Sequence, residues 1–114
     1  MYDLVIRNGK VVDGSGAPAY NADVAVNGNR IVKIGMIKEA ARSEVDAAGK
    51  VVTPGFIDPH THFDAQLLWD GCAKPALSHG VTTIVSGNCS LSLAPLKAKH
   101  RMKLVGMFNQ IEEM

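Results

Sequence analysis

Four side chains able to bind a metal ion or move a proton lie within seven positions of this 114-residue sequence: Asp58, His60, His62 and Asp64. His60 and His62 are two positions apart, and side chains at that spacing project to the same side of an extended strand. Two imidazoles can therefore converge on one metal ion from a single strand. We expect both histidines to be metal ligands. Asp58 could form a turn or orient a histidine from beside the site, and Asp64 could face solvent or support the same site.

A third candidate ligand, Cys89, follows the β-branched run at residues 81–86, which is typical of a buried parallel strand. In parallel barrels the functional groups lie at the carboxyl ends of the strands, so neighbouring strands would bring Cys89 and the two histidines to one rim. Imidazole nitrogen and thiolate sulfur both suit zinc, and a catalytic zinc site keeps one position open for water. Taken alone, Cys89 could also be a small buried apolar residue. The three residues together predict a zinc site.

The remaining histidines and the second cysteine have simpler interpretations. His79 and His100 stand alone and are interpreted as ordinary surface or core residues. Cys72 has no ligand-like neighbours, and we interpret it as structural. Two thiols in a reducing compartment are more often free or ligating than joined in a disulfide, and the sequence does not pair them.

Short β-rich segments separated by turn residues make up residues 1–54. Asn-Gly at positions 8–9, and again at 27–28, lies between β-branched runs, which is a strong hairpin signal. A further strand pair is expected around Gly49, and the glycine-rich residues 13–18 are expected to form an exposed loop. We expect a small β domain over residues 1–54 that is part of a composite β-sandwich.

Residues 55–114 change to the pattern of a parallel α/β fold. A buried strand is expected at 56–58, a second at 81–86, and an amphipathic helix over 96–114, where apolar residues recur every three or four positions. Short helical pieces are expected between the strands, with Trp69 in the core or as a lid over the site. Strand, crossover, strand and helix in this order indicate the α/β class.

Composition and charge exclude several classes of partner. The sequence is 46% hydrophobic and 20% charged, which is typical of a globular protein, and its 12 basic and 11 acidic residues give a net charge of +1. The charges are spread along the chain, so no nucleic-acid partner is expected. No apolar run approaches the roughly 18 residues that a membrane helix needs, and the start lacks a secretion signal. We expect a cytoplasmic protein with no membrane partner.

Three stretches of the sequence resemble one enzyme family. Residues 54–62, Pro-Gly-Phe-Ile-Asp-Pro-His-Thr-His, resemble the amidohydrolase superfamily, whose first barrel strand ends in a His-x-His metal motif. Residues 63–70 and 79–89 are similar to its N-acyl-D-amino-acid deacylase (D-aminoacylase) branch, in which a cysteine after the second barrel strand is a zinc ligand. The resemblance covers nearly the whole chain.

This resemblance implies metal-ligand roles for His60, His62 and Cys89 and a cofactor of one or two zinc ions. The sequence departs from the family pattern after the cysteine, where Ser90 stands in place of a common glycine. It departs again after Trp-Asp, where Gly71 stands in place of a frequent proline. Neither departure removes a ligand, but Ser90 can change the loop backbone if the family glycine has a positive φ.

The resemblance also implies a reaction. The complete protein is expected to be a hydrolase that removes the acyl group from N-acyl-D-amino acids, small-molecule substrates whose amide carbonyl is attacked by a zinc-bound hydroxide. A complete (β/α)₈ barrel takes about 250 residues, so we expect an N-terminal fragment whose residues 55–114 begin an incomplete TIM barrel. We expect this fragment to hold no catalytic residue and to be inactive alone, and its oligomeric state is undetermined.

Two alternatives stay open. The chain could be a non-catalytic metal-binding or interaction module that is stable by itself. It could also belong to a hydrolase of cyclic amides, as in hydantoinase-like relatives, although the Gly-Asn-Cys turn at residues 87–89 disfavours this.

Overall fold

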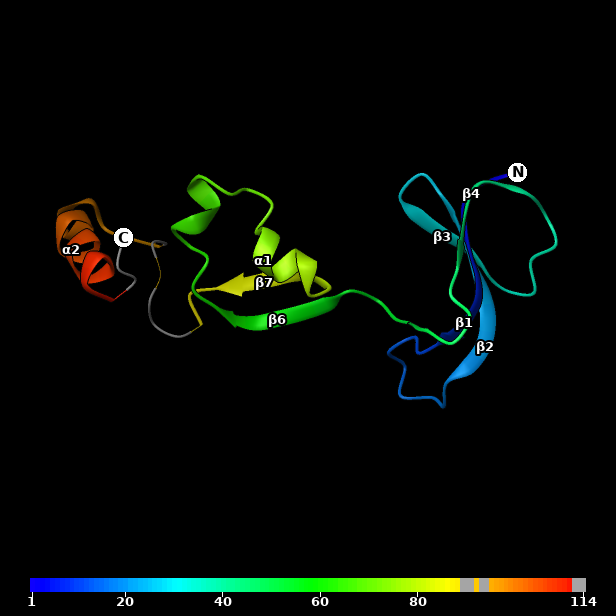
Figure 1. Cartoon of the computed structure of the whole chain (residues 1–114). Coiled ribbons are helices and arrows are strands. Elements are labelled where there is room, and N and C mark those ends of the chain that lie inside the picture. Colours follow the sequence, from blue (N-terminus) through cyan, green and yellow to red (C-terminus); the bar gives the residue numbers. More distant parts are fainter. Residues whose placement is uncertain (89–91, 93–94, 112–114) are drawn as a thin grey trace. The chain divides into compact units, whose positions relative to one another are not determined.

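The computed structural model describes residues 1–88, 92 and 95–111, without the side chains of Phe108 and Ile111. The chain divides into two compact units, Met1–Pro54 (unit 1) and Gly55–Met114 (unit 2), and each is described by itself (Figure 1). Unit 1 is built from strands, whereas unit 2 contains two strands and the described helices.

Unit 1 is a mixed five-stranded sheet. Its strands are β1 Tyr2–Val11, β2 Tyr20–Asn27, β3 Arg30–Gly35, β4 Ala41–Asp46 and β5 Val51–Val52. β2 pairs antiparallel with β1 and β3, whereas β4 and β5 both run parallel to β1. The strand order is β3-β2-β1-β4, with β5 also beside β1, so β1 is the central strand.

The first predicted hairpin is wrong, because β1 runs without reversal through Asn8 and Gly9. Asn8 has a φ of 60°, and the pairing of β1 with β2 shifts register between Ile6 and Gly9. The Asn-Gly pair therefore forms a bulge in a long strand instead of a turn. A Cβ at position 9 would lie 2.5 Å from Val52 Cγ2 on β5, so any larger residue would force Val52 to shift.

The second predicted hairpin is confirmed by the antiparallel pairing of β2 with β3. Gly28, with a φ of 56°, begins its two-residue turn, and its backbone N donates to Asp3 Oδ2 at 2.8 Å. The exposed loop at 13–18 is also confirmed. The strand pair expected around Gly49 is wrong in its pairing, because β4 and β5 each pair with β1 and not with each other.

Arg7 links three parts of unit 1. Its Nη2 lies 2.6 Å from Glu44 Oε1 on β4, and its guanidinium also donates to the backbone carbonyls of Ile37 and Glu39 before that strand. Asp23 on β2 lies 3.6 Å from Arg7 Nη1. The hydrogen bond from Arg7 lowers the pKa of Glu44 from its ordinary value. This network joins β1 to strands on both of its sides.

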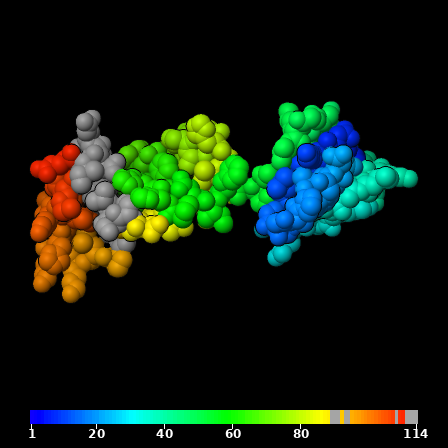
Figure 2. Space-filling model, turned by 90° about the horizontal axis from the view of Figure 1, so that it is seen from below, coloured from blue at the N-terminus to red at the C-terminus, as the bar shows by residue number. Residues whose placement is uncertain are grey.

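The core of unit 1 is small and lies against its central strands. Val5 on β1 and Ala25 on β2 are fully buried and cluster with Ile37, and Tyr2 and Ala41 pack against them. Figure 2 shows the residues of this unit, coloured blue to green, as one packed body. Its residues form a single sheet, so the second layer of the expected β-sandwich is not seen among the described residues.

Unit 2 contains a parallel strand pair joined by a helical crossover. Its elements are β6 Phe56–Thr61, the 3₁₀ turn η1 Gln66–Leu68, α1 Lys74–Ser78, β7 Val81–Ser86, the 3₁₀ turn η2 Ala98–His100 and α2 Arg101–Ile111. β6 and β7 are parallel, and α1 contacts β7. These observations confirm the α/β class. Within the described residues, no helix has the length and apolar character that crossing a membrane requires.

The predicted burial of unit 2 is wrong for the described chain. Phe56 and Ile57 on β6 are 60% and 67% exposed, and Trp69 is 66% exposed and so is not a core residue. The final helix begins at Arg101 and not at residue 96. Parallel strands are buried when helices cover both faces of their sheet, and the described part of unit 2 supplies one crossover helix to two strands.

Candidate metal centre

The two histidines lie at the carboxyl end of β6. His60 is the penultimate residue of the strand, and His62 directly follows its last residue, Thr61. The imidazole rings are stacked, with centroids 5.9 Å apart and an interplanar angle of 24°, and both residues are exposed. Alternation along the strand explains why the two rings share one side while Thr61, which is 4% exposed, is buried.

The separation of the rings is compatible with a shared metal ion. Two imidazole nitrogens bound to one tetrahedral zinc, each at about 2.0–2.1 Å, put the ring centres roughly 5 Å apart. The centroids of His60 and His62 are 5.9 Å apart, which is near that value. The donor chemistry of this pair therefore fits zinc.

The third predicted ligand, Cys89, lies outside the described residues. Within the ranges 1–88, 92 and 95–111, no group of three or more histidine, cysteine, aspartate or glutamate side chains is arranged to hold a metal ion. The described structure thus brings two candidate ligands together, His60 and His62.

Asp58 acts on the main chain beside the histidines. Its Oδ1 accepts a hydrogen bond from the backbone N of His60 at 3.1 Å. This contact between residues two apart is typical of an Asx turn, and it stabilises the backbone that carries His60. The sequence left two roles open for Asp58, forming a turn or orienting a histidine, and this contact with the backbone amide of His60 is that of a turn former.

Asp64 connects the end of the histidine segment to the loop after β7. Its Oδ1 accepts a hydrogen bond from Ser92 Oγ at 2.9 Å. Ser92 is three residues beyond Cys89 in the sequence, so this contact joins the segments that carry the two kinds of predicted ligand.

Two further polar contacts at this end of the strands were missed by the sequence reasoning. Asn88 Nδ2 donates to the carbonyl oxygen of Pro59 at 2.8 Å, and Thr61 Oγ1 donates to the carbonyl oxygen of Val85 at 3.3 Å. An asparagine directly before a candidate ligand is a weak signal by itself. The contact with Pro59 spans 29 positions and depends on how β6 and β7 pair.

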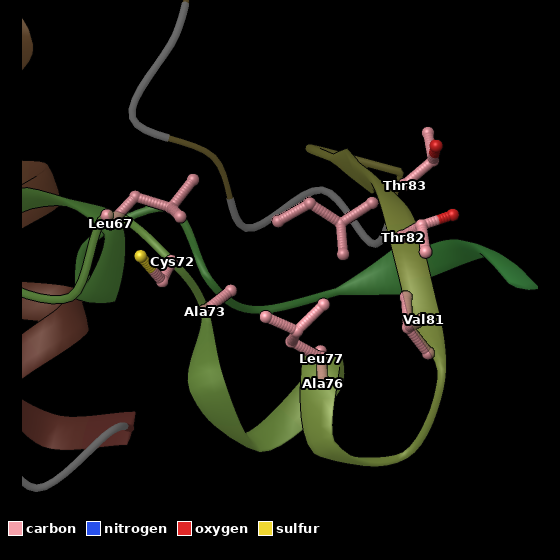
Figure 3. Close-up of a pocket in the computed structure, with 10 residues that line it drawn as sticks. Leu67, Cys72, Ala73, Ala76, Leu77, Val81, Thr82 and Thr83 are labelled. Atoms are coloured by element: carbon pink, nitrogen blue, oxygen red, sulfur yellow. The ribbon is translucent and has the colours of Figure 1, made fainter. Parts of the chain in front are cut away.

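A hollow elsewhere in unit 2 is separate from this centre. It has a volume of about 240 Å³ and is lined mainly by apolar side chains from the crossover and β7, including Leu67, Ala73 and Leu77 (Figure 3). Cys72, an exposed free thiol, lies at its edge, and neither His60 nor His62 lines it. The hollow contains no pair of ligand-type side chains among its lining residues.

Comparisons with known proteins identify relatives of this chain. The model of an amidohydrolase family matches residues 43–112. A D-aminoacylase from Alcaligenes xylosoxydans xylosoxydans is 50% identical over 96 residues, which are 83% of this chain and 20% of that protein.

Solved structures are also similar. An N-acyl-D-glutamate deacylase from Bordetella bronchiseptica, complexed with zinc and a phosphonate inhibitor, is 41% identical with a TM-score of 0.78, over 86% of this chain and 21% of that one. An L-hydantoinase from Arthrobacter aurescens is 28% identical with a TM-score of 0.62, over 74% of this chain and 20% of that one. The chain therefore spans about a fifth of the length of these relatives.

Proposed function

Because this chain belongs to the amidohydrolase family, we propose that it is the N-terminal part of a zinc-dependent hydrolase that removes the acyl group from N-acyl-D-amino acids. The identity of 50% to a D-aminoacylase over 83% of the chain carries this proposal. The stacked pair of His60 and His62 at the end of β6 supports it, since two imidazoles on one side of a strand suit a metal-dependent reaction.

In this proposal His60, His62 and Cys89 are ligands in a site that holds one or two zinc ions. A bound zinc ion would acidify a coordinated water and polarise the amide carbonyl of the substrate. Asp58 keeps the backbone of His60 in place through the 3.1 Å hydrogen bond to its amide, and Asp64 anchors the segment beyond His62 to Ser92. The residues that move protons would come from parts of the complete protein that correspond to the remaining four fifths of its relatives.

The proposal extends to the fold. β6 and β7 would be the first two strands of a (β/α)₈ barrel, and unit 1 would contribute to a β-sandwich. The TM-score of 0.78 to a deacylase over 86% of the chain supports this, as do the exposed apolar side chains of Phe56 and Ile57, which further strands and helices would cover. We also propose that the complete protein is cytoplasmic and that its substrates are small N-acyl amino acids.

The test is to express the complete protein that carries this sequence and to compare it with the His60→Asn, His62→Asn double variant. We expect the wild type to bind zinc and to release the acyl group from N-acetyl-D-amino acids. The double variant should lose more than about 100-fold in activity and most of its zinc, because removing a direct ligand costs at least as much as removing its supporting partners. A double variant with full zinc content and full activity would contradict the assignment.

A cyclic-amide substrate is the second candidate, since a hydantoinase also matches the chain. The identities of 41% and 28%, with TM-scores of 0.78 and 0.62, favour the linear amide. The two candidate substrates are distinguished by assaying one enzyme preparation with an N-acetyl-D-amino acid and with a hydantoin. Faster opening of the hydantoin ring would support the hydantoinase reaction. A preparation that binds zinc but hydrolyses neither would favour a non-catalytic metal-binding module.

A further inference from the structure

Asparagine followed by glycine occurs twice in the sequence, at Asn8-Gly9 and at Asn27-Gly28. In this dipeptide the backbone nitrogen of the glycine can attack the side-chain carbonyl carbon of the asparagine, because glycine has no Cβ to hinder the approach. The attack closes a succinimide ring and releases ammonia, which is one reason why asparagine is a thermolabile residue. Both dipeptides lie in unit 1, but their surroundings differ.

At Asn27-Gly28 both reacting groups are hydrogen-bonded to Asp3 on β1. The backbone N of Gly28, which is the nucleophile, donates to Asp3 Oδ2 at 2.8 Å. Asn27 Oδ1, on the carbonyl that is attacked, accepts a hydrogen bond from the backbone N of Asp3 at 3.0 Å. A general base acts from about 2.6–3.2 Å, and a donor to a developing oxyanion from about 2.7–3.1 Å. Asp3 meets both requirements.

The surroundings of this turn permit the reaction. Arg42 Nη1 on β4 lies 3.2 Å from Asp3 Oδ1, which leaves Asp3 Oδ2 for Gly28. The attack uses the face of the planar peptide unit, whereas the N–H of Gly28 lies in that plane, so its hydrogen bond does not obstruct the approach. Asn27 and Gly28 are exposed, and water can therefore reach the ring to open it.

At Asn8-Gly9 the same dipeptide is held inside a paired strand. Asn8 Nδ2 donates to Asp46 Oδ1 at 3.0 Å, and the backbone N of Asn8 donates to Asp23 Oδ1 at 2.9 Å. Neither contact involves the nitrogen of Gly9 or the side-chain oxygen of Asn8. Gly9 is buried and pairs with β2, so ring closure there requires the central strand to open.

We propose that Asn27 is a site of spontaneous deamidation that Asp3 promotes. The carboxylate of Asp3 takes the proton of Gly28 N as this nitrogen bonds to Asn27 Cγ, and the backbone N–H of Asp3 stabilises the negative charge on Asn27 Oδ1. The Cγ–Nδ2 bond of Asn27 then breaks, and Nδ2 leaves with that proton as ammonia. Water opens the succinimide to aspartate or isoaspartate, so water is consumed and ammonia released in equal number.

Either product alters the turn between β2 and β3. Asn27 pairs with Arg30 across this turn, and isoaspartate adds a methylene to the main chain at that point. Both products also place a new carboxylate beside that of Asp3, and like charges at short range repel each other. Deamidation therefore weakens the contact between the turn and β1.

The experiment incubates the full chain at neutral pH and follows each asparagine by mass spectrometry of peptides. Exchange of an amide for a carboxyl group raises the peptide mass, and chromatography separates isoaspartate from aspartate. Asn8 is the internal control with the same dipeptide, and the chain unfolded in urea gives the rates without folded structure. We expect folding to raise the rate at Asn27 about 10-fold or more and to lower the rate at Asn8.

Two variants isolate the carboxylate. Asp3→Asn and Asp3→Ala both remove it, and both keep the backbone N–H that donates to Asn27 Oδ1. The rate at Asn27 in the folded chain should fall about 10- to 100-fold in each. Asp46→Asn is the matched control, since it removes the carboxylate that contacts Asn8, and it should leave the rate at Asn27 unchanged.

A rate at Asn27 that is no faster in the folded wild type than in urea overturns the proposal. An unchanged rate in the folded Asp3 variants overturns it too, and a faster rate would show that these contacts protect Asn27. The rate at Asn8 also reports whether a variant is folded, because it rises to the unfolded value when β1 loses its partners. Where Asp3→Ala does not fold, Asp3→Asn decides, since its side-chain oxygen can still accept from Gly28. The comparison of folded and unfolded wild type decides without either variant.

Discussion

The two units of this chain differ in how fully their strands are paired and buried. In unit 1 the central strand β1 has partners on both sides, and Arg7 ties it to Glu44 on β4 and to the loop before that strand. In unit 2 β6 and β7 pair with each other, and the described residues leave Phe56 and Ile57 largely exposed. Unit 1 therefore buries part of its central strands, although Ile31 on β3 and Val45 on β4 are 63% and 48% exposed, whereas the described strands of unit 2 bury no large apolar side chain.

The histidine and cysteine side chains are also distributed unequally between the two units. All four histidines and both cysteines of the sequence lie in unit 2. Side chains that bind a metal must stay accessible and converge from several segments, and loops at strand ends provide this more readily than a paired sheet does. The candidate metal ligands and the buried cluster of Val5, Ala25 and Ile37 thus lie in different units.

Amide hydrogen exchange should give the largest difference between the units. We expect amides of β6 and β7 to exchange at least about 100-fold faster than those of β1, because local opening costs least where few apolar contacts cover a strand. Exchange measured by mass spectrometry on peptides from each unit checks this. Equal protection of the amides of β1 and β6 would contradict the expected difference between the two units.

A core substitution should give the next largest effect, confined to unit 1. Val5→Ala removes apolar groups from a fully buried site and should lower the free energy of unfolding of unit 1 by about 2 kcal/mol. Val51→Ala is the matched control, since Val51 is 58% exposed, and it should change that free energy by less than about 0.5 kcal/mol. Denaturant unfolding followed by exchange in unit 1 peptides measures both, and similar losses would contradict the proposed core.

Acid should weaken unit 1 by a smaller amount. The hydrogen bond from Arg7 holds the folded-state pKa of Glu44 below its ordinary value of 4.5. The ionised Glu44 therefore stabilises the folded state above about pH 4.5, and this contribution is lost as the pH falls through the lowered folded-state pKa. Glu44→Gln lacks a titrating group there, so its melting temperature should fall less on acidification than that of the wild type. Identical acid sensitivity of the two proteins would show that the Arg7 contact has no effect on stability.

Local turn chemistry predicted one hairpin and failed at the other, although the same dipeptide occurs in both. At Asn27-Gly28 the turn follows the end of β2, just beyond the last pairing of β2 with β1 at Val26 and Leu4, and the antiparallel hairpin with β3 forms as expected. At Asn8-Gly9 the strand is held by β2 on one side and by β4 and β5 on the other. Pairing of β1 with its neighbours before and after this dipeptide outweighs the local preference for a turn, and the dipeptide becomes a bulge.

In the candidate site, too, the sequence predicted a local feature and missed contacts between distant segments. Spacing along one strand was enough to predict that His60 and His62 lie together, because the alternation of a strand is a local property. Asn88 and Ser92 gave no such signal, since their partners Pro59 and Asp64 are 29 and 28 positions away. Such contacts depend on the register between two strands and on the path of the loop that follows them.

By itself the sequence determined the α/β class, the second hairpin and the histidine pair, because each depends on residues a few positions apart. Only the tertiary structure decided that β1 is a single central strand, that β4 and β5 run parallel to it, and that Asn88 and Ser92 join the loop after β7 to the histidine segment. The physical reason is that pairing and side-chain contacts between distant segments compete with local preferences, and their outcome depends on which segments meet in space.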